Sequence, residues 1–448
     1  MQNVLLFVIG VLIIAVGLGV SIALHEVGHL VPAKKFGVKV TQYMIGFGPT
    51  IFSRRRGETQ YGVKAFPLGG YISMVGMFPP AKEGGKLRRT STGFFNSLVQ
   101  DARKASTESV GDDDSRAFYK LPVWKRVVIM LGGPTMNLLL GILFFAIVLC
   151  GFGIAGASTT VGSVSACVQP ASTTTTSTST TCASTDPVSP GAAAGILPGD
   201  KIVSINGTAI STWDQSTDII RQSAGVPLTF VVLRNGADVT LTVTPLLTER
   251  DVTEIVNNQS VVKTDASGAA VTEQVGFVGI GYATELQPQP ITAVLPFVGE
   301  NVAGVANTIF NLPQRLSGVA QAAFGGGTRS ADSPMSVVGV GRVAGEIATI
   351  DIPLQSKVAT LIGLLGSVNI GLFVINLVPL MPLDGGHIAG ALWEGLRRRV
   401  AKLFGRRDPG PVDTARLMPL TFVVVVFLGG VSALLMYADI VNPVNIFG

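Results

Sequence analysis

The sequence is poor in charged residues. Only 14% of its 448 residues are Asp, Glu, Lys or Arg, whereas soluble domains average about 25%. The mean hydropathy is +0.50, which excludes an ordinary cytosolic enzyme. The net charge of +5 comes from basic residues beside apolar runs, so we expect no nucleic-acid partner. We interpret the chain as a membrane protein in contact with lipid.

Long apolar runs define the expected spans. A hydrocarbon core about 30 Å thick needs roughly 20 apolar residues in a helix. The first run is too long for a signal peptide and lacks a basic start and a small-residue cleavage site, so we predict an uncleaved span. The four runs of sufficient length are 4–24, 127–151, about 359–380 and about 417–437.

The distribution of Lys and Arg predicts the orientation. Residues 31–126 carry 17 basic and 7 acidic residues, and residues 384–416 carry 7 and 4. In contrast, residues 153–356 carry 8 basic and 15 acidic residues. Because basic loops stay in the cytoplasm, we expect both basic loops inside, and the central region and both termini outside. The location expected is a bacterial plasma membrane, crossed several times.

There are only three cysteines, and two of them fall in the external region. Cys150 ends the second apolar run, whereas Cys167 and Cys182 lie beyond it. An oxidising compartment permits a disulfide between these two. Two unpaired thiols in a flexible loop are the alternative.

The segments between the spans differ in character. Residues 38–77 alternate in polarity and are broken by Gly and Pro, which predicts β-hairpins. Residues 78–117 are charged and read as an insertion, in which 94–99 form either a short exposed helix or a membrane-surface contact. Residues 171–185 are a Ser/Thr-rich linker, and 303–323 show helical patterning.

A fairly specific signature marks the external region. The run A-A-G-I-L-P-G-D-K-I-V-S-I-N-G at 193–207 closely resembles that of PDZ domains, and residues 160–248 match the length of such a domain. PDZ domains bind peptides by adding a strand to a sheet edge.

His25-Glu26-Val27-Gly28-His29 lies at the cytoplasmic end of the first run. On a helix, the two histidines share a face and can bind one metal ion, with Glu26 placed to activate water. Ionisable residues beside a hydrocarbon core are costly and usually functional. The alternative is that these residues only form a polar helix end near the membrane interface, without binding a metal ion.

A third ligand is needed, because catalytic zinc takes three protein ligands and one open position. No third histidine follows His29 at the spacing of soluble relatives. Asp384 follows two prolines and precedes two glycines at the end of the third run, so irregular backbone presents it at membrane depth. A turn residue or a helix N-cap is the alternative for Asp384.

These motifs, with G-F-G-P at 46–49, G-P-T-M-N at 133–137 and N-x-x-P-x-x-P-L-D-G at 376–385, together resemble the site-2 protease family of intramembrane zinc metalloproteases, peptidase family M50. The single PDZ domain and external cysteine pair are most similar to actinobacterial members that cleave anti-sigma factors. The resemblance covers nearly the whole chain.

The resemblance implies the site residues. His25, His29 and Asp384 would bind one zinc ion per chain, and Glu26 would be the general base. Asn376 would contact the substrate backbone, and Gly46, Phe47 and Gly48 would also bind substrate. The stretch 38–75 resembles the family's membrane-associated β-loop and would pair with an unwound substrate segment as an added strand.

Two further residues are less constrained. Asn137 would form an interhelical hydrogen bond or contact substrate. His387 is expected at a helix start or interface rather than as a ligand.

The predicted fold class is an α-helical membrane protein with four spans, a β-hairpin loop and an extracytoplasmic PDZ domain. The expected function is regulated intramembrane proteolysis of single-span substrates, such as anti-sigma factors trimmed by a site-1 protease, which releases a cytoplasmic signalling fragment. A metal transporter, which would usually show repeated halves, and a PDZ-bearing scaffold are the rival classes. The segments expected are spans at 1–37, 127–152, 357–383 and 417–438, the β-loop at 38–77, cytoplasmic loops at 78–126 and 384–416, the PDZ domain at 160–248 and an external connecting region at 249–356.

Overall fold

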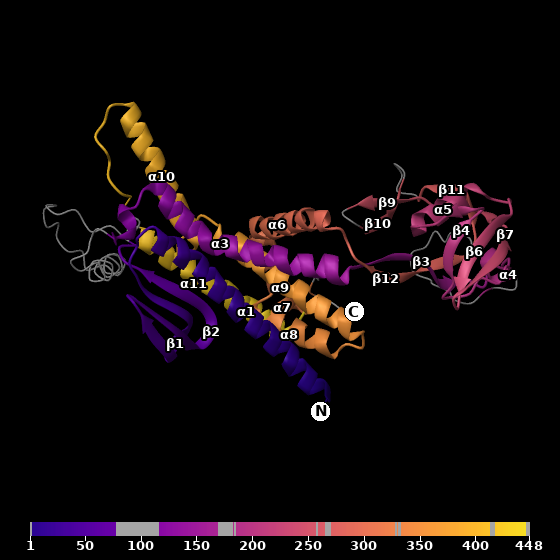
Figure 1. The fold of residues 1–448 in the computed structure, drawn as a ribbon, viewed down its shortest axis with the longest axis horizontal. Helices are drawn as coiled ribbons and strands as arrows, with labels where there is room; N and C mark the ends of the chain where they lie inside the picture. The colour runs from indigo at the N-terminus through magenta and orange to yellow at the C-terminus, as the bar shows by residue number, and fades with distance from the viewer. Residues whose placement is uncertain are drawn as a thin grey trace. The chain divides into compact units, whose positions relative to one another are not determined.

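The computed structural model divides the chain into two compact units, residues 1–152 with 289–448, and residues 153–288 (Figure 1). The predictions for 94–99 and for nearly all of the Ser/Thr-rich tract lie outside the described residues. The structure describes residues 2–77, 116–168, 182, 185–256, 259–264, 270–327, 329, 333–412 and 417–444.

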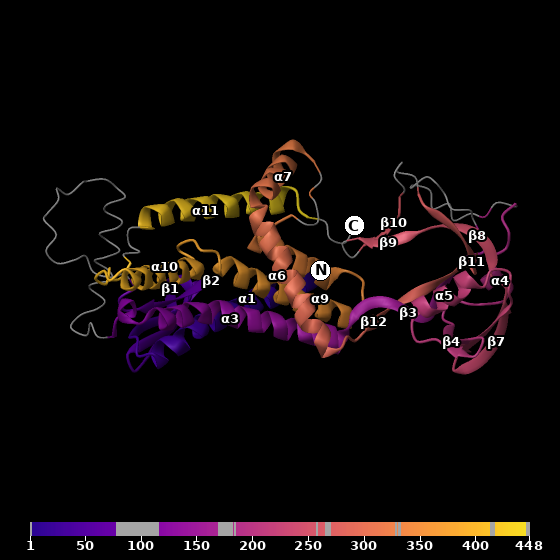
Figure 2. The ribbon, with the colours of Figure 1, turned by 90° about the horizontal axis from the view of Figure 1, so that it is seen from above.

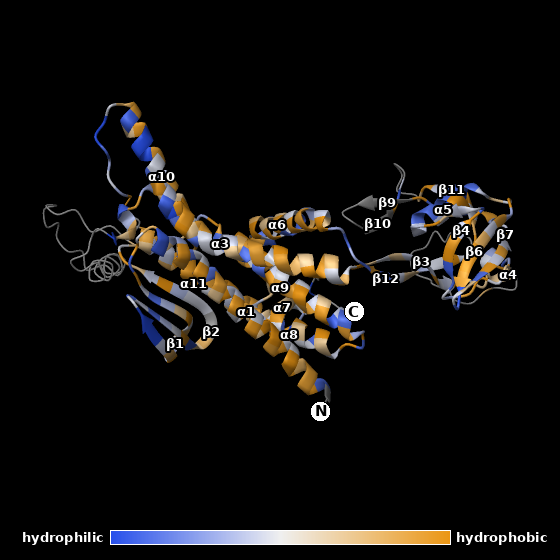
Figure 3. Ribbon diagram, in the orientation of Figure 1, coloured by the Kyte–Doolittle hydropathy of each residue, from blue (hydrophilic) through white to orange (hydrophobic). Residues whose placement is uncertain are grey.

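Long apolar helices form the first unit (Figure 3). Helix α1 packs on α3, and α3 packs on α9. The first contact is very close, because a Cβ atom added to Gly28 would lie 2.2 Å from the carbonyl oxygen of Gly132. Small residues permit such an approach between membrane helices. The long helices are α1 (Gln2–Lys35), α3 (Val123–Ala146, continued to Phe152 by a π-helical turn), α9 (Leu354–Asn376) and α11 (Met418–Val441).

Among the residues that the structure describes, a fifth helix is also long and apolar enough to cross a membrane, and the four-span prediction did not count it. Residues Ile291–Phe310 comprise a 3₁₀ turn and α6 (Val294–Phe310), with the lowest hydropathy of the five candidates. The helix expected at 303–323 is in fact broken at Asn311, and α7 (Leu312–Gly325) follows with Pro313 in its first turn. Proline lacks the N–H that would continue a helix.

The amino-terminal half of α1 and the carboxyl-terminal end of α11 lie at the same end of the bundle. Both contact α8 (Val337–Thr349). Gly10 of α1 faces the backbone of Ala344, and Gly339 faces the carboxylate of Asp439 in α11. This arrangement places both termini of the described chain on one side.

Helices α6 and α7 cross one face of this bundle (Figure 2). The segment before α6 starts beside the end of α3, where the Gln289 amide donates to the Leu149 carbonyl. Halfway along the fifth candidate, Glu300 is exposed. A charged side chain at the centre of a bilayer costs about 3 kcal/mol or more, which disfavours a lipid-embedded position for this helix.

A hairpin packs beside the second half of α1. It consists of β1 (Val40–Arg56) and β2 (Thr59–Met74). Gly46 and Gly48 adopt φ of +90° and +87°, a backbone region that glycine enters freely, and β1 bends there. Gln42 consequently pairs with both Gln60 and Ser73. The end of β2 forms an edge, since within the described ranges no other strand pairs with it.

One expected boundary near the third span is wrong. The helix α9 ends at Asn376, not at 383, because Pro379 and Pro382 follow. The connection expected at 384–416 begins with the 20-residue helix α10 (Asp384–Leu403).

The second unit is built on an antiparallel sheet of order β12-β3-β4-β6-β7, with β5 on β4. Its core contains Ile202, Ile205 and Phe230. Cys167 and Cys182 form a disulfide with a Cα–Cα distance of 6.0 Å. The elements are β3 (Ile154–Val164), α4 (Pro190–Ala193), β4 (Lys201–Ile205), β5 (Thr208–Ala209), α5 (Trp213–Gln222), β6 (Leu228–Arg234), β7 (Ala237–Val243), β8 (Leu246–Asp251), β9 (Thr253–Val256), β10 (Gln259–Val262), β11 (Thr272–Phe277) and β12 (Ile280–Gln287).

The predicted PDZ boundaries, 160–248, are therefore too narrow for this unit. The strand β3 starts at Ile154, and β12, which was assigned to the connecting region, pairs with it from Ile280↔Val164 to Gln287↔Ile154. Pairing between strands that lie far apart in the chain cannot be recognised from the sequence of either strand alone.

Candidate metal centre

Two histidines of α1 face the same point. His25 and His29 are one helical turn apart, which places their side chains on one face. Their Nε2 atoms are 3.2 Å apart and their rings meet edge to face. Both residues are buried, with 8% and 5% of their surface exposed.

Asp384 completes the group from the other end of the sequence. It is the first residue of α10, and its Oδ2 atom lies 3.3 Å from His25 Nε2 and 3.2 Å from His29 Nε2. Within the described ranges, these three residues form the one cluster of His, Cys, Asp or Glu that can hold a metal ion. The alternative of a simple turn residue does not explain this convergence.

The three atoms fit a zinc ion. Their separations of 3.2, 3.3 and 3.2 Å are edges of a near-regular tetrahedron, whose centre lies about 2.0 Å from each corner, the usual Zn–N and Zn–O distance. Two imidazoles and one carboxylate with an open fourth position are the donor set of a catalytic zinc site. The residues present therefore suit zinc.

The neighbouring helix α3 orients this group. His29 donates a hydrogen bond from Nδ1 to the carbonyl of Ile129, at 2.7 Å, which leaves Nε2 as the ligand atom. Gly133 faces both rings, since a Cβ atom there would lie 2.2 Å from His29 Nε2 and 2.7 Å from His25 Nε2. A side chain at this position would occupy the space beside the ligand atoms.

The group opens into a cavity of about 320 Å³. Glu26 and Asn376 line it, as does the edge of β2. His387, one turn beyond Asp384, also lines it but does not belong to the metal-binding group. The lining residues are His25, Glu26, His29, Gly70, Tyr71, Ile72, Met74, Met77, Met130, Asn376, Pro382, Leu383, Asp384 and His387.

The structure thus brings five of the sequence-predicted residues together and leaves out three. Gly46, Phe47 and Gly48 do not line the cavity; Phe47 instead stacks on Tyr71, with ring centroids 6.3 Å apart. The sequence resemblance placed substrate pairing in the stretch 38–75 without indicating which part of it borders the cavity, and sequence reasoning missed Gly133. The G-P-T-M-N motif was a signal for Gly133, although nothing in it indicates contact with the histidines.

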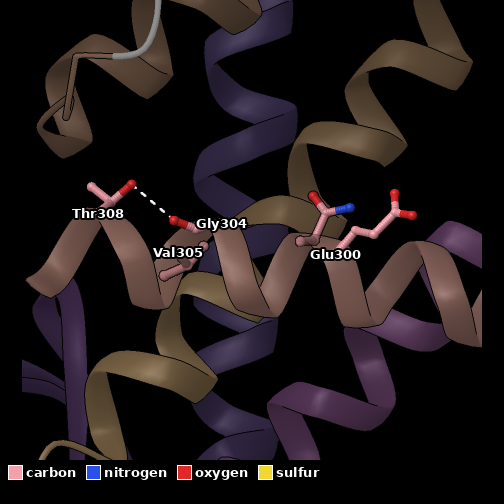
Figure 4. A pocket seen from close by; sticks show the side chains of 5 residues that line it. Glu300, Gly304, Val305 and Thr308 are labelled. Atoms are coloured by element: carbon pink, nitrogen blue, oxygen red, sulfur yellow. Dashed lines mark hydrogen bonds between the residues drawn. The ribbon is translucent and has the colours of Figure 1, made fainter. Parts of the chain in front are cut away.

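A second hollow, on α6, offers no comparable chemistry (Figure 4). It is lined by Glu300, Asn301, Gly304, Val305 and Thr308. Thr308 and Asn301 donate to carbonyls of their own helix, those of Gly304 and Phe297. One carboxylate without a neighbouring base or ligand does not form a catalytic group.

Comparisons with known proteins agree with this geometry. The chain matches the profile described as peptidase family M50 over residues 13–407. It is similar to the zinc metalloprotease Rip1 of Mycobacterium bovis, with 33% identity over 453 residues that cover 99% of this chain and 100% of the relative. Rip1 of Mycolicibacterium smegmatis is 32% identical over 455 residues, with the same coverage. The metalloprotease MmpA of Caulobacter vibrioides is 29% identical over 409 residues, which cover 87% of this chain and 89% of its own.

Proposed function

Because this chain belongs to peptidase family M50 and is a zinc metalloendopeptidase, we propose that it cleaves peptide bonds within or beside the transmembrane segments of its substrates. Membership of the family excludes the metal transporter and the scaffold. The observation that carries the proposal is the convergence of His25, His29 and Asp384 beside Glu26 inside a bundle of apolar helices.

In this proposal His25, His29 and Asp384 hold one zinc ion. Bound zinc polarises a carbonyl and lowers the pKa of water towards 7. Glu26 shares their cavity without belonging to the metal-binding group, so its carboxylate is free for proton transfer. It takes the proton of the attacking water and gives it to the leaving amine.

The substrate would bind as an extended strand. The peptide bonds of a helix are shielded by their own hydrogen bonds, so cleavage requires an unwound segment. Residues Gly70–Met74 supply an edge beside Glu26, where main-chain pairing can hold such a segment. Asn376, at the end of α9, lines the same cavity and would bind the substrate backbone. Gly46, Phe47 and Gly48 would act indirectly, by shaping the hairpin.

The topology proposed has four spans and both termini outside the cytoplasm. The start of α1 and the end of α11 lie at the same end of the bundle, which supports an even number of membrane crossings. The basic residues of 31–126 and 384–416 support a cytoplasmic location for these two segments. Helices α6 and α7 would enter from outside and return there. The Cys167–Cys182 disulfide agrees with an external second unit.

The substrates would be single-span membrane proteins such as anti-sigma factors, shortened first by a site-1 protease. The second unit would act as the PDZ domain that filters them by size or terminus. Cleavage near the cytoplasmic end of α1 would release a cytoplasmic signalling fragment.

The test is to express Glu26→Gln and wild-type protein in cells and compare the shortened membrane stubs that accumulate. We expect stubs to accumulate with Glu26→Gln and not with wild-type protein. The zinc content should be near one per chain in both purified proteins, because Glu26 is not a ligand. His25→Ala is the matched control, which should lose both zinc and cleavage. Substantial turnover by Glu26→Gln would refute the general-base role.

A further inference from the structure

His387 is a histidine of the cavity to which the proposed chemistry assigns no role. It lines the same space as Glu26, and it lies outside the metal-binding group. Within the described part of the chain, its ring makes no hydrogen bond to another residue. A neutral imidazole carries one N–H donor, so this donor remains available to a molecule that enters the cavity.

Two glycines determine which way the first turn of α10 faces. A Cβ atom added to Gly385 or to Gly386 would lie 2.3 Å or 2.6 Å from backbone atoms of the preceding turn, residues 377–381. This side of the helix therefore packs directly on that turn. Asp384 and His387, three residues apart, lie on the opposite side, which is the side that faces the histidines of α1.

The proposed zinc position therefore has a polar side chain beside it from each of two helices. Glu26 belongs to α1 and lies directly on the β2 edge, since a Cβ atom added to Gly70 would lie 3.0 Å from Glu26 Cγ. His387 enters the same cavity from α10. Side chains three residues apart on a helix have Cβ atoms about 5–6 Å apart, so the His387 ring can reach an atom bound beside the Asp384 carboxylate.

The cavity has few other donors for an oxygen that becomes negative. Tyr71 already donates its hydroxyl to Gln42 Oε1, at 3.2 Å, and Asn376 is proposed to bind the substrate backbone. Glu26 and Asp384 contribute two carboxylates, and no lysine or arginine of the described chain lines the cavity. Donors that are already aimed at developing charge in a site with little water stabilise a transition state strongly. The imidazole on α10 is such a donor.

We propose that His387 is a catalytic residue, whose ring N–H donates a hydrogen bond to the oxygen of the scissile carbonyl as water adds to its carbon. In that step a C–O bond forms, the π electrons of the carbonyl move to its oxygen, and Glu26 takes the water proton. The C–N bond then breaks, the carbonyl forms again and the proton passes to the leaving amine. His387 gains and loses no proton. This role rests on the proposed function and is separate from zinc binding.

The experiment uses purified full-length protein in detergent, and its substrate is the membrane stub that accumulates in cells with Glu26→Gln. His387→Phe keeps an aromatic ring without a donor and should lower kcat about 100- to 1000-fold, with KM and zinc content unchanged. His387→Gln can still donate and should retain a higher kcat than His387→Phe. The pH profile of the remaining activity should keep both limbs, because His387 transfers no proton.

The matched control is Leu392→Ala on the same helix. Leu392 is exposed and does not line the cavity. Its replacement should leave kcat, KM and zinc content unchanged, which separates the loss of a donor from a general disturbance of α10. His387→Leu carries the same expectation as His387→Phe and replaces it if the aromatic ring prevents folding.

Wild-type kcat in His387→Phe, or an equal loss in His387→Gln, would overturn the role of His387 as a donor. Loss of zinc from both variants would overturn it as well, because the residue would then support the metal site. Loss of one limb of the pH profile would make it a proton-transfer group instead. Glu26→Gln separates these results from failure of the proposed function. If no stub accumulated with Glu26→Gln, or if that variant cleaved the stub, the proposed chemistry would be wrong whatever His387 does.

Discussion

Gly133→Ala should strongly weaken zinc binding without unfolding the protein. The added Cβ atom would lie 2.2 Å from His29 Nε2, which is about 1.2 Å short of ordinary van der Waals contact at 3.4 Å. Zinc–ligand distances vary by only about 0.2 Å, so His29 cannot both avoid the methyl group and remain a ligand. His25 Nε2, at 2.7 Å from the same atom, is displaced as well.

The size of the effect follows from the number of ligands affected. Altering one residue behind a ligand already costs 10- to 100-fold in metal affinity. Displacing a ligand itself should cost about 100-fold or more, which is about 2.7 kcal/mol or more. Cleavage should fall in proportion to the zinc lost.

The assay is chelator competition with purified protein, with thermal unfolding measured in parallel. Gly371→Ala, in α9, is the matched control, because a Cβ atom there meets nothing within 4 Å. It should leave zinc affinity unchanged and preserve or slightly raise stability. Wild-type zinc affinity in a folded Gly133→Ala protein would refute the assignment of the histidines and the close packing of α3 against them.

Two predictions concern stability. Hydrogen bonds from Arg234 hold the pKa of Asp200 below its usual range. The pair therefore stabilises the second unit fully at pH values above the unfolded-state pKa of about 3.9. This stabilisation is lost as the pH falls through the lower folded-state pKa. Asp200→Asn should therefore speed hydrogen exchange in β4 and β6 at pH 7 and reduce its acid dependence; an unchanged acid profile would contradict this. Glu394→Leu would leave the buried Arg126 guanidinium without its bidentate partner and should cost about 3–5 kcal/mol in denaturant unfolding. Glu394 also accepts from Arg398 and from the Val412 amide. Adding Arg126→Met should therefore recover only the part of the loss that comes from the unpaired guanidinium, and no recovery would show that this part is negligible.

Local patterns were enough to predict the elements that depend on local physics. The spacing of His25 and His29 defines a shared helix face whatever the rest of the fold does, and an apolar run long enough to cross a membrane is a property of its own residues. The hairpin at 38–77 followed from alternation and from glycine at the bends. The prediction of Asp384 came from broken backbone near the membrane and from the resemblance, and the structure places it beside the histidines.

Other features depend on contacts between distant segments. The length of α6 was missed because its hydropathy is low and it is followed at once by a proline-containing helix. The extent of the second unit was missed because β12 joins the sheet only through pairing with β3.

The sequence by itself determined the membrane location, the long apolar helices and the pair of imidazoles on one helix face, since periodicity and hydrophobicity act over a few turns. Only the tertiary structure decided that the edge of β2, rather than Gly46–Gly48, borders the cavity, and that Gly133 leaves the ligand atoms their space. These are products of helix packing, where the position of one small residue sets how closely two segments far apart in the sequence can approach.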